Sequence, residues 1–170
     1  VLSSVYCSRG MNMKNIKDKI VQAHCDIPCG VYDPIKAQYS AISLVRFVDQ
    51  IAELEDTLTE TSGLAKFSRL IAQKDLHAQE VKDEVVVIWG DYFKEDQIKK
   101  HPDIHNLVHN IIRLSSTCKQ EINREASVQL VEKVNEFAEK FWNTKDIETT
   151  QKKSPNPPFL SVSYPLLEDA

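Results

Sequence analysis

The feature that most constrains this chain is the recurrence of apolar residues at intervals of three and four along four separate segments. This spacing places the apolar side chains on one side of an α-helix. The first two expected helices cover residues 34–57 and 63–92. The third begins near Pro102, and the fourth covers residues 122–143. Four amphipathic helices with short links predict an all-α fold, an antiparallel four-helix bundle.

Two details of this pattern bear on the architecture. The first helix carries two adjacent apolar stripes, which cover about half of its circumference at ~100° per residue. A face this wide predicts contact with both the bundle and another subunit, so we expect a homo-oligomer. The segment VVVIW at 85–89 has strand propensity, but it continues the helical period of its surroundings, which favours a helix.

Composition excludes several classes of protein. The chain has only four glycines, which disfavours all-β folds and glycine-rich phosphate loops. Its net charge is -4 with no basic run, so we expect no nucleic-acid partner. No apolar run approaches the ~18 residues of a membrane span, so we expect no membrane partner.

The two ends of the chain differ from its middle. Residues 1–23 are basic and lack the apolar stretch of a secretory signal, and we interpret them as a leader that is removed on maturation. Residues 24–145 form the predicted domain. Residues 146–170 hold four of the seven prolines and show no helical period, so we expect a poorly ordered tail there.

The four cysteines argue against a disulfide scaffold. Cys7, Cys25 and Cys29 fall in the first 29 residues, and Cys118 is isolated. This usage suits a reducing compartment and predicts a cytoplasmic protein. We expect Cys118 to be a small buried residue and Cys7 to leave with the leader.

One short segment concentrates side chains that bind metals: His24, Cys25, Asp26 and Cys29. A zinc site would need two further ligands from elsewhere, and a thioredoxin-like site would need two residues between its cysteines instead of three. The alternative is that both cysteines are merely small apolar residues in a turn.

At this point a resemblance becomes specific. The segment HCDIPCGVYDP, residues 24–34, resembles the metal-binding hook of the nickel superoxide dismutase family. The stretch from Trp89 to Lys94 is similar to a second segment of that family, and weaker similarity continues through 101–105 and 141–145. The resemblance implies a bundle with an N-terminal metal-binding hook, assembled as a homohexamer.

The resemblance also implies an activity and its cofactor. Family members disproportionate superoxide to dioxygen and hydrogen peroxide with one nickel ion per subunit. A leader-processing protease frees the amine of His24, and the implied metal ligands are His24, Cys25 and Cys29. Their chemistry is consistent with this, because thiolates lower the potential of the nickel couple and an N2S2 donor set suits square-planar Ni2+.

Further residues receive roles from the same resemblance. Tyr32 is implied to gate the open face of the metal, and Asp26 to order the hook. Lys94 is expected to attract the superoxide anion locally, and the alternative is a solvated lysine at the end of a helix. Tyr92 and Trp89 are expected beneath the hook, with ordinary packing as the alternative interpretation.

The chain departs from the family at one place. Some members brace the axial imidazole with a glutamate on the first helix and an arginine on the second, where this chain has Ser40 and His77. The missing ion pair puts the stability of axial binding in doubt.

Two alternatives stay open. The first is a non-enzymatic helical nickel or copper carrier or sensor. The second concerns the histidines at 101, 105 and 109, which share one helix face at a spacing that can bind zinc. We expect these three to be solvated or hydrogen-bonded and not to form the functional metal site.

Overall fold

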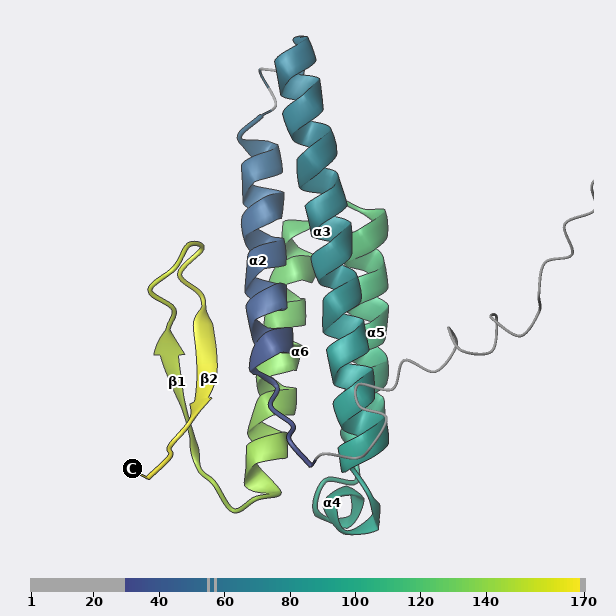
Figure 1. The fold of residues 1–170 in the computed structure, drawn as a ribbon, viewed down its shortest axis with the longest axis vertical. Coiled ribbons are helices and arrows are strands. Elements are labelled where there is room, and N and C mark those ends of the chain that lie inside the picture. Colours follow the sequence, from purple (N-terminus) through teal and green to yellow (C-terminus); the bar gives the residue numbers. More distant parts are fainter. Residues whose placement is uncertain (1–29, 55, 57, 169–170) are drawn as a thin grey trace, which may run out of the picture.

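The computed structural model describes residues 30–54, 56 and 58–168. Four long helices pack side by side, and each contacts two others around the bundle, so the predicted four-helix bundle is confirmed (Figure 1). Residues 24–29, the part of the predicted hook that holds the proposed metal ligands, lie outside the described residues. The long helices are α2 (Ile35–Ala52), α3 (Thr61–Val87), α5 (Ile104–Gln120) and α6 (Arg124–Asn143).

The helix boundaries follow local signals. Asp33 Oδ1 accepts a hydrogen bond from the Ile35 amide at 2.8 Å, which stabilises the start of α2 close to the predicted position. The helix ends at Ala52, earlier than expected. Residues 85–89 are helical, which confirms the choice of helix over strand for this segment.

The end of the second long helix changes its winding. After α3 the chain continues as η2 (Ile88–Tyr92), a π-helical turn, and then as the short helix α4 (Glu95–Lys100). A π-turn rotates the side chains that follow it relative to a regular helix and occurs often at functional sites. The sequence period predicted neither the π-turn nor α4.

Apolar side chains from all four long helices form the main core. Its largest members are completely buried, among them Leu44, Ile111, Phe137 and Phe141. Cys118 is also buried, as predicted, and burial raises the pKa of its thiol. A second, smaller cluster lies around Ile51, where α2 and α3 extend past the ends of α5 and α6 (Figure 1).

One lysine lies inside the bundle. Lys74 is 1% exposed, and its ammonium donates hydrogen bonds to the carbonyl oxygens of Cys118 and Lys119 and to Asp75. These carbonyls belong to the last turn of α5, where helical partners are missing. Lys74 therefore caps a neighbouring helix, which explains how a cation is tolerated there.

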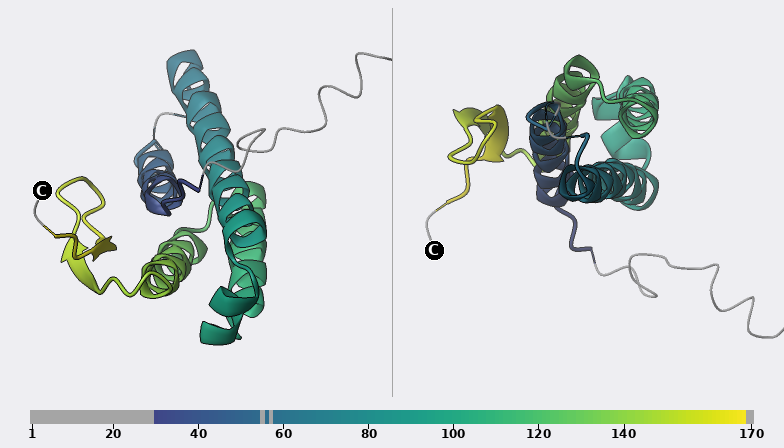
Figure 2. Two further views of the ribbon diagram at one scale, coloured as in Figure 1. Left: turned by 60° about the horizontal axis from the view of Figure 1, so that its bottom comes forward. Right: turned by 90° about the horizontal axis from the view of Figure 1, so that it is seen from above.

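The C-terminal segment corrects the expectation of a poorly ordered tail. Strands β1 (Thr149–Lys153) and β2 (Ser161–Pro165) form an antiparallel hairpin with Gln151 opposite Ser163. The hairpin lies beside α2 and α6 (Figure 2). Its attachment depends on contacts with distant helices, which a search for local periodicity does not detect.

Polar side chains join this hairpin to the bundle. Gln38 Nε2 donates to Asn135 Oδ1 at 3.1 Å and to the Ser163 carbonyl at 2.8 Å. Asn135 also accepts from the Ser163 amide and donates to the Ser161 carbonyl. Gln38, Asn135 and Ser163 are at most 6% exposed, so the network is shielded from water.

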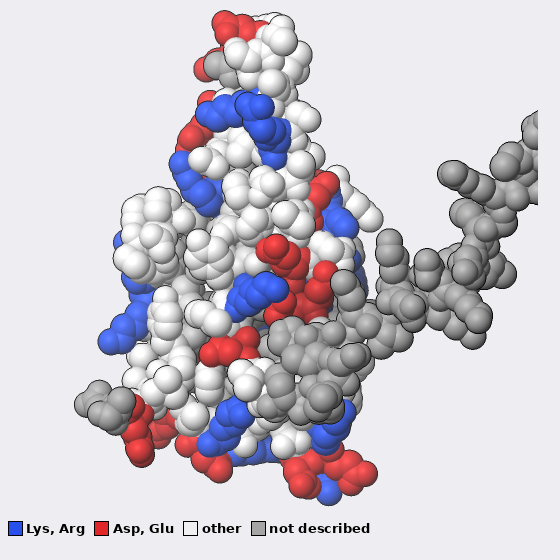
Figure 3. Space-filling model, viewed as in Figure 1, with Lys and Arg blue, Asp and Glu red and all other residues white. Residues whose placement is uncertain are grey.

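None of the helices in the described part of the chain is both long enough and apolar enough to cross a membrane. On the face shown in Figure 3, acidic and basic side chains of the described residues are interspersed.

Candidate metal centre

The described chain begins at Gly30, within the predicted hook and immediately after its last proposed ligand, Cys29. Gly30 has φ +72°, a left-handed conformation that favours glycine. Residues 30–34 then run along the end of the bundle where α4 lies (Figure 1). His24, Cys25, Asp26 and Cys29 lie outside the described residues, so their roles stay predictions, and the site can be built only from the residues that follow them.

Tyr32 lies against a tyrosine that is distant in sequence. Its ring centroid is 5.8 Å from that of Tyr92, with 51° between the two planes. Tyr92 is in turn held by Phe141, at 4.8 Å, and by Phe93, at 5.4 Å. The π-turn and the end of α6 thus position Tyr92, and the start of α2 brings Tyr32 to it.

Trp89 belongs to the same end of the bundle. Its indole Nε1 donates to His105 Nδ1 at 2.9 Å, and the two rings meet edge to face at 5.7 Å. Trp89 is half-buried and packs against the main core. Trp89 therefore has a specific partner, His105. From the sequence, His105 is expected only to lie on a helix face.

Two lysines place positive charge near the tyrosine pair. Lys94 is exposed, and its ammonium donates to the Gly90 carbonyl at 2.9 Å. Lys145, which the sequence analysis did not single out, places its ammonium 4.9 Å from the centroid of the Tyr92 ring and 5.3 Å from that of Phe141. Neither lysine forms an ion pair with an acidic side chain of the described residues.

Thr144 is a second residue that sequence reasoning missed. Its Oγ1 lies 2.6 Å from the Tyr92 hydroxyl oxygen. Both Thr144 and Lys145 fall in the segment 141–145, whose weak family similarity was the available signal. Sequence alone did not place this segment against Tyr92.

The three histidines expected on one helix face do not share a helix, because His101 ends α4 and precedes α5, whereas His105 and His109 lie in α5. His101 Nε2 lies 3.0 Å from Asn143 Oδ1, whereas His105 bonds to Trp89. Burial lowers the pKa of His101, although the hydrogen bond to Asn143 opposes this shift. Within the described residues, no three His, Cys, Asp or Glu side chains gather in a way that could hold a metal ion.

The two positions that depart from the family have other partners here. Ser40 is 2% exposed, and its hydroxyl donates to Glu80 Oε2 at 2.9 Å. His77 Nδ1 lies 2.9 Å from the Gln73 carbonyl oxygen, and its ring meets Phe47 edge to face. One turn before Ser40, Lys36 forms an ion pair with Glu84, and this hydrogen bond raises the pKa of Lys36.

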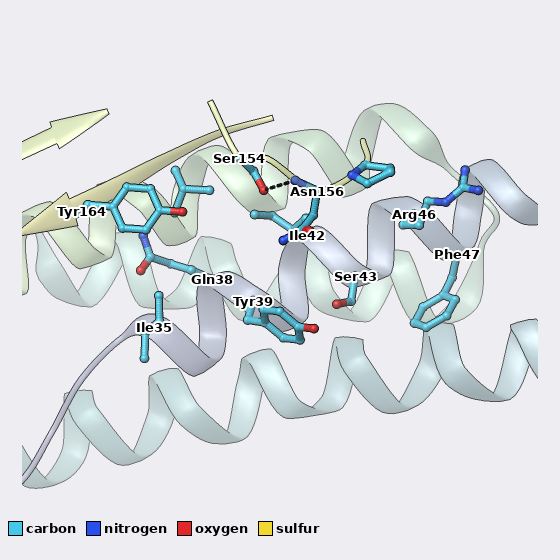
Figure 4. Close-up of a pocket in the computed structure, with 12 residues that line it drawn as sticks. Ile35, Gln38, Tyr39, Ile42, Ser43, Arg46, Phe47, Ser154, Asn156 and Tyr164 are labelled. Carbon is cyan, nitrogen blue, oxygen red and sulfur yellow. Dashed lines mark hydrogen bonds between the residues drawn. The ribbon is translucent and has the colours of Figure 1, made fainter. Parts of the chain in front are cut away.

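A pocket of about 240 Å³ lies elsewhere, between α2 and the hairpin (Figure 4). Ile35, Gln38 and Tyr39 line it from α2, and Asn156 and Tyr164 line it from the hairpin segment. None of the predicted site residues within the described chain contributes to it. The pocket is therefore separate from the tyrosine pair.

Comparison with known proteins identifies the family of this chain. A family model described as nickel-containing superoxide dismutase matches residues 19–145. The superoxide dismutase [Ni] of Streptomyces coelicolor is 32% identical over 125 residues, which cover 74% of this chain and 90% of that protein. The corresponding enzyme of Streptomyces seoulensis is 30% identical over the same coverage.

Solved structures agree with the sequence matches. The native nickel superoxide dismutase structure at 1.30 Å superposes with a TM-score of 0.65 at 30% identity, covering 72% of this chain and 99% of that one. A structure with nickel ligation corresponding to the oxidized state gives a TM-score of 0.65 at 29% identity, with the same coverage.

The helical fold and these matches place the chain in the class of metal-dependent oxidoreductases. Within that class, it belongs to the family of nickel-containing superoxide dismutases. The C-terminal hairpin lies beyond the matched residues.

Proposed function

We propose that this nickel superoxide dismutase holds its metal with His24, Cys25 and Cys29, one ion per subunit, beside the pair formed by Tyr32 and Tyr92. The observation that carries the proposal is the contact between these two rings, whose centroids are 5.8 Å apart. Tyr32 comes three residues after Cys29, the last proposed ligand, so the contact supports a role for both phenols beside the proposed site.

The donor set fits nickel. The His24 amine, the Cys25 amide nitrogen and thiolate, and the Cys29 thiolate provide two nitrogen and two sulfur donors, a set suited to square-planar Ni2+. When bound, nickel supplies a one-electron couple between its 2+ and 3+ states. The His24 imidazole would supply a further nitrogen ligand, and Asp26 would order the hook.

The reaction consumes protons as well as electrons. Two superoxide anions and two protons give one dioxygen and one hydrogen peroxide. Tyr32 is half-buried and closely follows the last proposed ligand, so its phenol is suited to hold substrate or water at the open face. The Tyr32 ring contacts Tyr92, and Trp89 is proposed to pack beneath the hook.

The charges around the tyrosine pair suit an anionic substrate. The exposed ammonium groups of Lys94 and Lys145 lie at this end of the bundle without an acidic partner among the described residues. Local positive charge concentrates an anion and raises its association rate, even when the net charge of the protein is negative.

Maturation and assembly belong to the same proposal. A protease cleaves between Ala23 and His24, because the site requires a free amine, which a chain extended through Ala23 does not provide. The processed subunits form a homo-oligomer, the hexamer that the family resemblance implies, and act in the cytoplasm. The exposed apolar side chains of Ile35 and Tyr39 on α2, at 46% and 66%, support a subunit contact.

The decisive experiment compares the chain with and without residues 1–23. Both forms are reconstituted with Ni2+, bound nickel is measured by mass spectrometry, and superoxide loss is followed by pulse radiolysis. We expect activity only in the processed form, and one added residue before His24 should abolish it. Equal activity in both forms would contradict the amine-ligand mechanism.

The same samples test the alternatives. A processed protein that binds nickel but is inert would support the carrier or sensor. Replacing the histidines at 101, 105 and 109 together should leave nickel content and turnover intact. Light scattering that shows only a ~15–19 kDa monomer would contradict the oligomer.

A further inference from the structure

The last turn of α6 holds the hydroxyl group nearest to Tyr92. Thr144 is the residue that ends α6, and its amide donates to the carbonyls of Lys140 and Phe141. Its Oγ1 donates to the Phe141 carbonyl at 2.5 Å and lies 2.6 Å from the Tyr92 hydroxyl oxygen. Thr144 thus connects the end of the helix to the phenol.

Counting protons assigns a direction to this contact. A threonine hydroxyl carries one proton and can donate only one strong hydrogen bond. At 2.5 Å from the Phe141 carbonyl, an oxygen that can only accept, that proton is committed to Phe141. The Tyr92 hydroxyl must then be the donor to Thr144, because two oxygens 2.6 Å apart need a proton between them.

We infer that Thr144 is a positioning residue that holds the Tyr92 hydroxyl as a donor to α6, so that only the lone pairs of Tyr92 face the nickel site. The inference deepens the proposed function, since it rests on that site lying beside Tyr32. Toward the site, Tyr92 then acts only as a hydrogen-bond acceptor.

The surroundings of Tyr92 favour the hydrogen bond from its hydroxyl to Thr144. Phe141 and Phe93 pack against the ring, and the Lys145 ammonium lies over its face. Contacts on several sides limit rotation of the ring away from Thr144. Thr144 is only half-buried, but its donor bond is directed to a carbonyl of its own helix and does not depend on solvent.

The first test measures the hydrogen bond itself and requires no nickel. Ultraviolet resonance Raman spectra report whether a tyrosine hydroxyl donates or accepts, and subtracting the spectrum of Tyr92→Phe isolates Tyr92. In the full chain we expect a strong donor signature that Thr144→Val removes and Thr144→Ser retains. A Tyr92 that shows no donor signature, or that Thr144→Val leaves unchanged, overturns the inference.

The second test measures turnover of the processed, nickel-loaded protein. Thr144→Val should reduce kcat about tenfold, the low end for a partner that orients a site residue, and change its pH profile, while Thr144→Ser restores both. Thr117→Val is the matched control, because the half-buried Thr117 of α5 also donates its hydroxyl proton to a carbonyl of its own helix, that of Arg113. It should leave turnover unchanged.

The two tests separate this inference from the function on which it rests. A Raman shift in Thr144→Val with unaltered kcat and pH profile overturns the positioning role. Absence of superoxide turnover in the nickel-loaded parent overturns the proposed site, whereas the Raman result on the metal-free chain still decides the direction of the bond. Circular dichroism establishes that each variant is folded.

Discussion

The helical bundle and the C-terminal hairpin are held by different kinds of contact. The bundle buries an almost entirely apolar core, with Phe137 and Phe141 completely enclosed. The hairpin segment contributes one buried apolar side chain, Val162, and the half-buried Leu160, which packs against the main core. It is also attached through the buried polar groups of Gln38, Asn135 and Ser163. Apolar burial is non-directional, whereas hydrogen bonds require matched partners.

This difference has consequences for stability and for position. Removing apolar area weakens the whole bundle, because its helices share one core. Removing a member of the polar network leaves its partners unpaired at one place, so the effect should concentrate in the hairpin. The following predictions test that contrast, in order of decreasing effect.

Phe137→Ala should lower the free energy of unfolding by about 3–5 kcal/mol, the usual cost of emptying a buried phenylalanine site. The side chain is 0% exposed and contacts Phe93, with 5.8 Å between ring centroids. Urea denaturation followed by circular dichroism measures the loss. Phe159→Ala, in the hairpin loop at 49% exposure, is the control and should change stability by less than about 0.5 kcal/mol.

Asn135→Ala should cost about 1–3 kcal/mol, because it leaves buried donors and acceptors of the hairpin unpaired. Hydrogen exchange should show fast exchange at the Ser163 amide, which donates to Asn135 Oδ1 at 3.2 Å, while amides of α5 keep their protection. Equal loss of protection in hairpin and bundle would show that the two regions unfold as one unit.

Val162→Ala should cost about 1.5 kcal/mol, from two methyl groups at roughly 0.8 kcal/mol each. The side chain is 2% exposed in β2. If the hairpin depends mainly on its polar network, the amides of β1 and β2 should lose less protection than in Asn135→Ala. A larger loss would reverse the assignment of which contacts hold the hairpin.

The smallest effect concerns pH and the contact between His101, at the end of α4, and Asn143, at the end of α6. Burial lowers the pKa of His101 in the folded protein, so folding favours the neutral ring. This contribution is fully present above the ordinary pKa of 6.5 and is lost as the pH falls through the lower folded value. His101→Gln should remove this part of the stability profile, measured by urea denaturation at stepped pH.

Asp103 provides the distinguishing control for that experiment. Its hydrogen bond with Lys140 lowers its pKa below the ordinary 3.8, so its contribution is present above that pH and is lost only in stronger acid. His101→Gln should leave this acid limb intact. If the free energy of unfolding of His101→Gln still decreases between the ordinary and the lowered pKa of His101, His101 is not the source of that decrease.

Much of the fold could be predicted because its determinants are local. Apolar spacing of three and four marks a helix wherever the core lies, and Asp33 stabilises the start of α2 through a neighbour two residues away. The proposed metal ligands are likewise predictable, because His24, Cys25 and Cys29 lie in one continuous segment whose chemistry needs no distant partner.

Only the tertiary structure decided the remaining features. Tyr32, Tyr92 and Thr144 come from three separate parts of the chain, and nothing in their local spacing places them together. The hairpin forms against α2 and α6 because Gln38 and Asn135 are buried at the positions that its backbone requires. Contacts between residues far apart in sequence depend on how the helices pack, and the periodicity of a single helix carries no information about them.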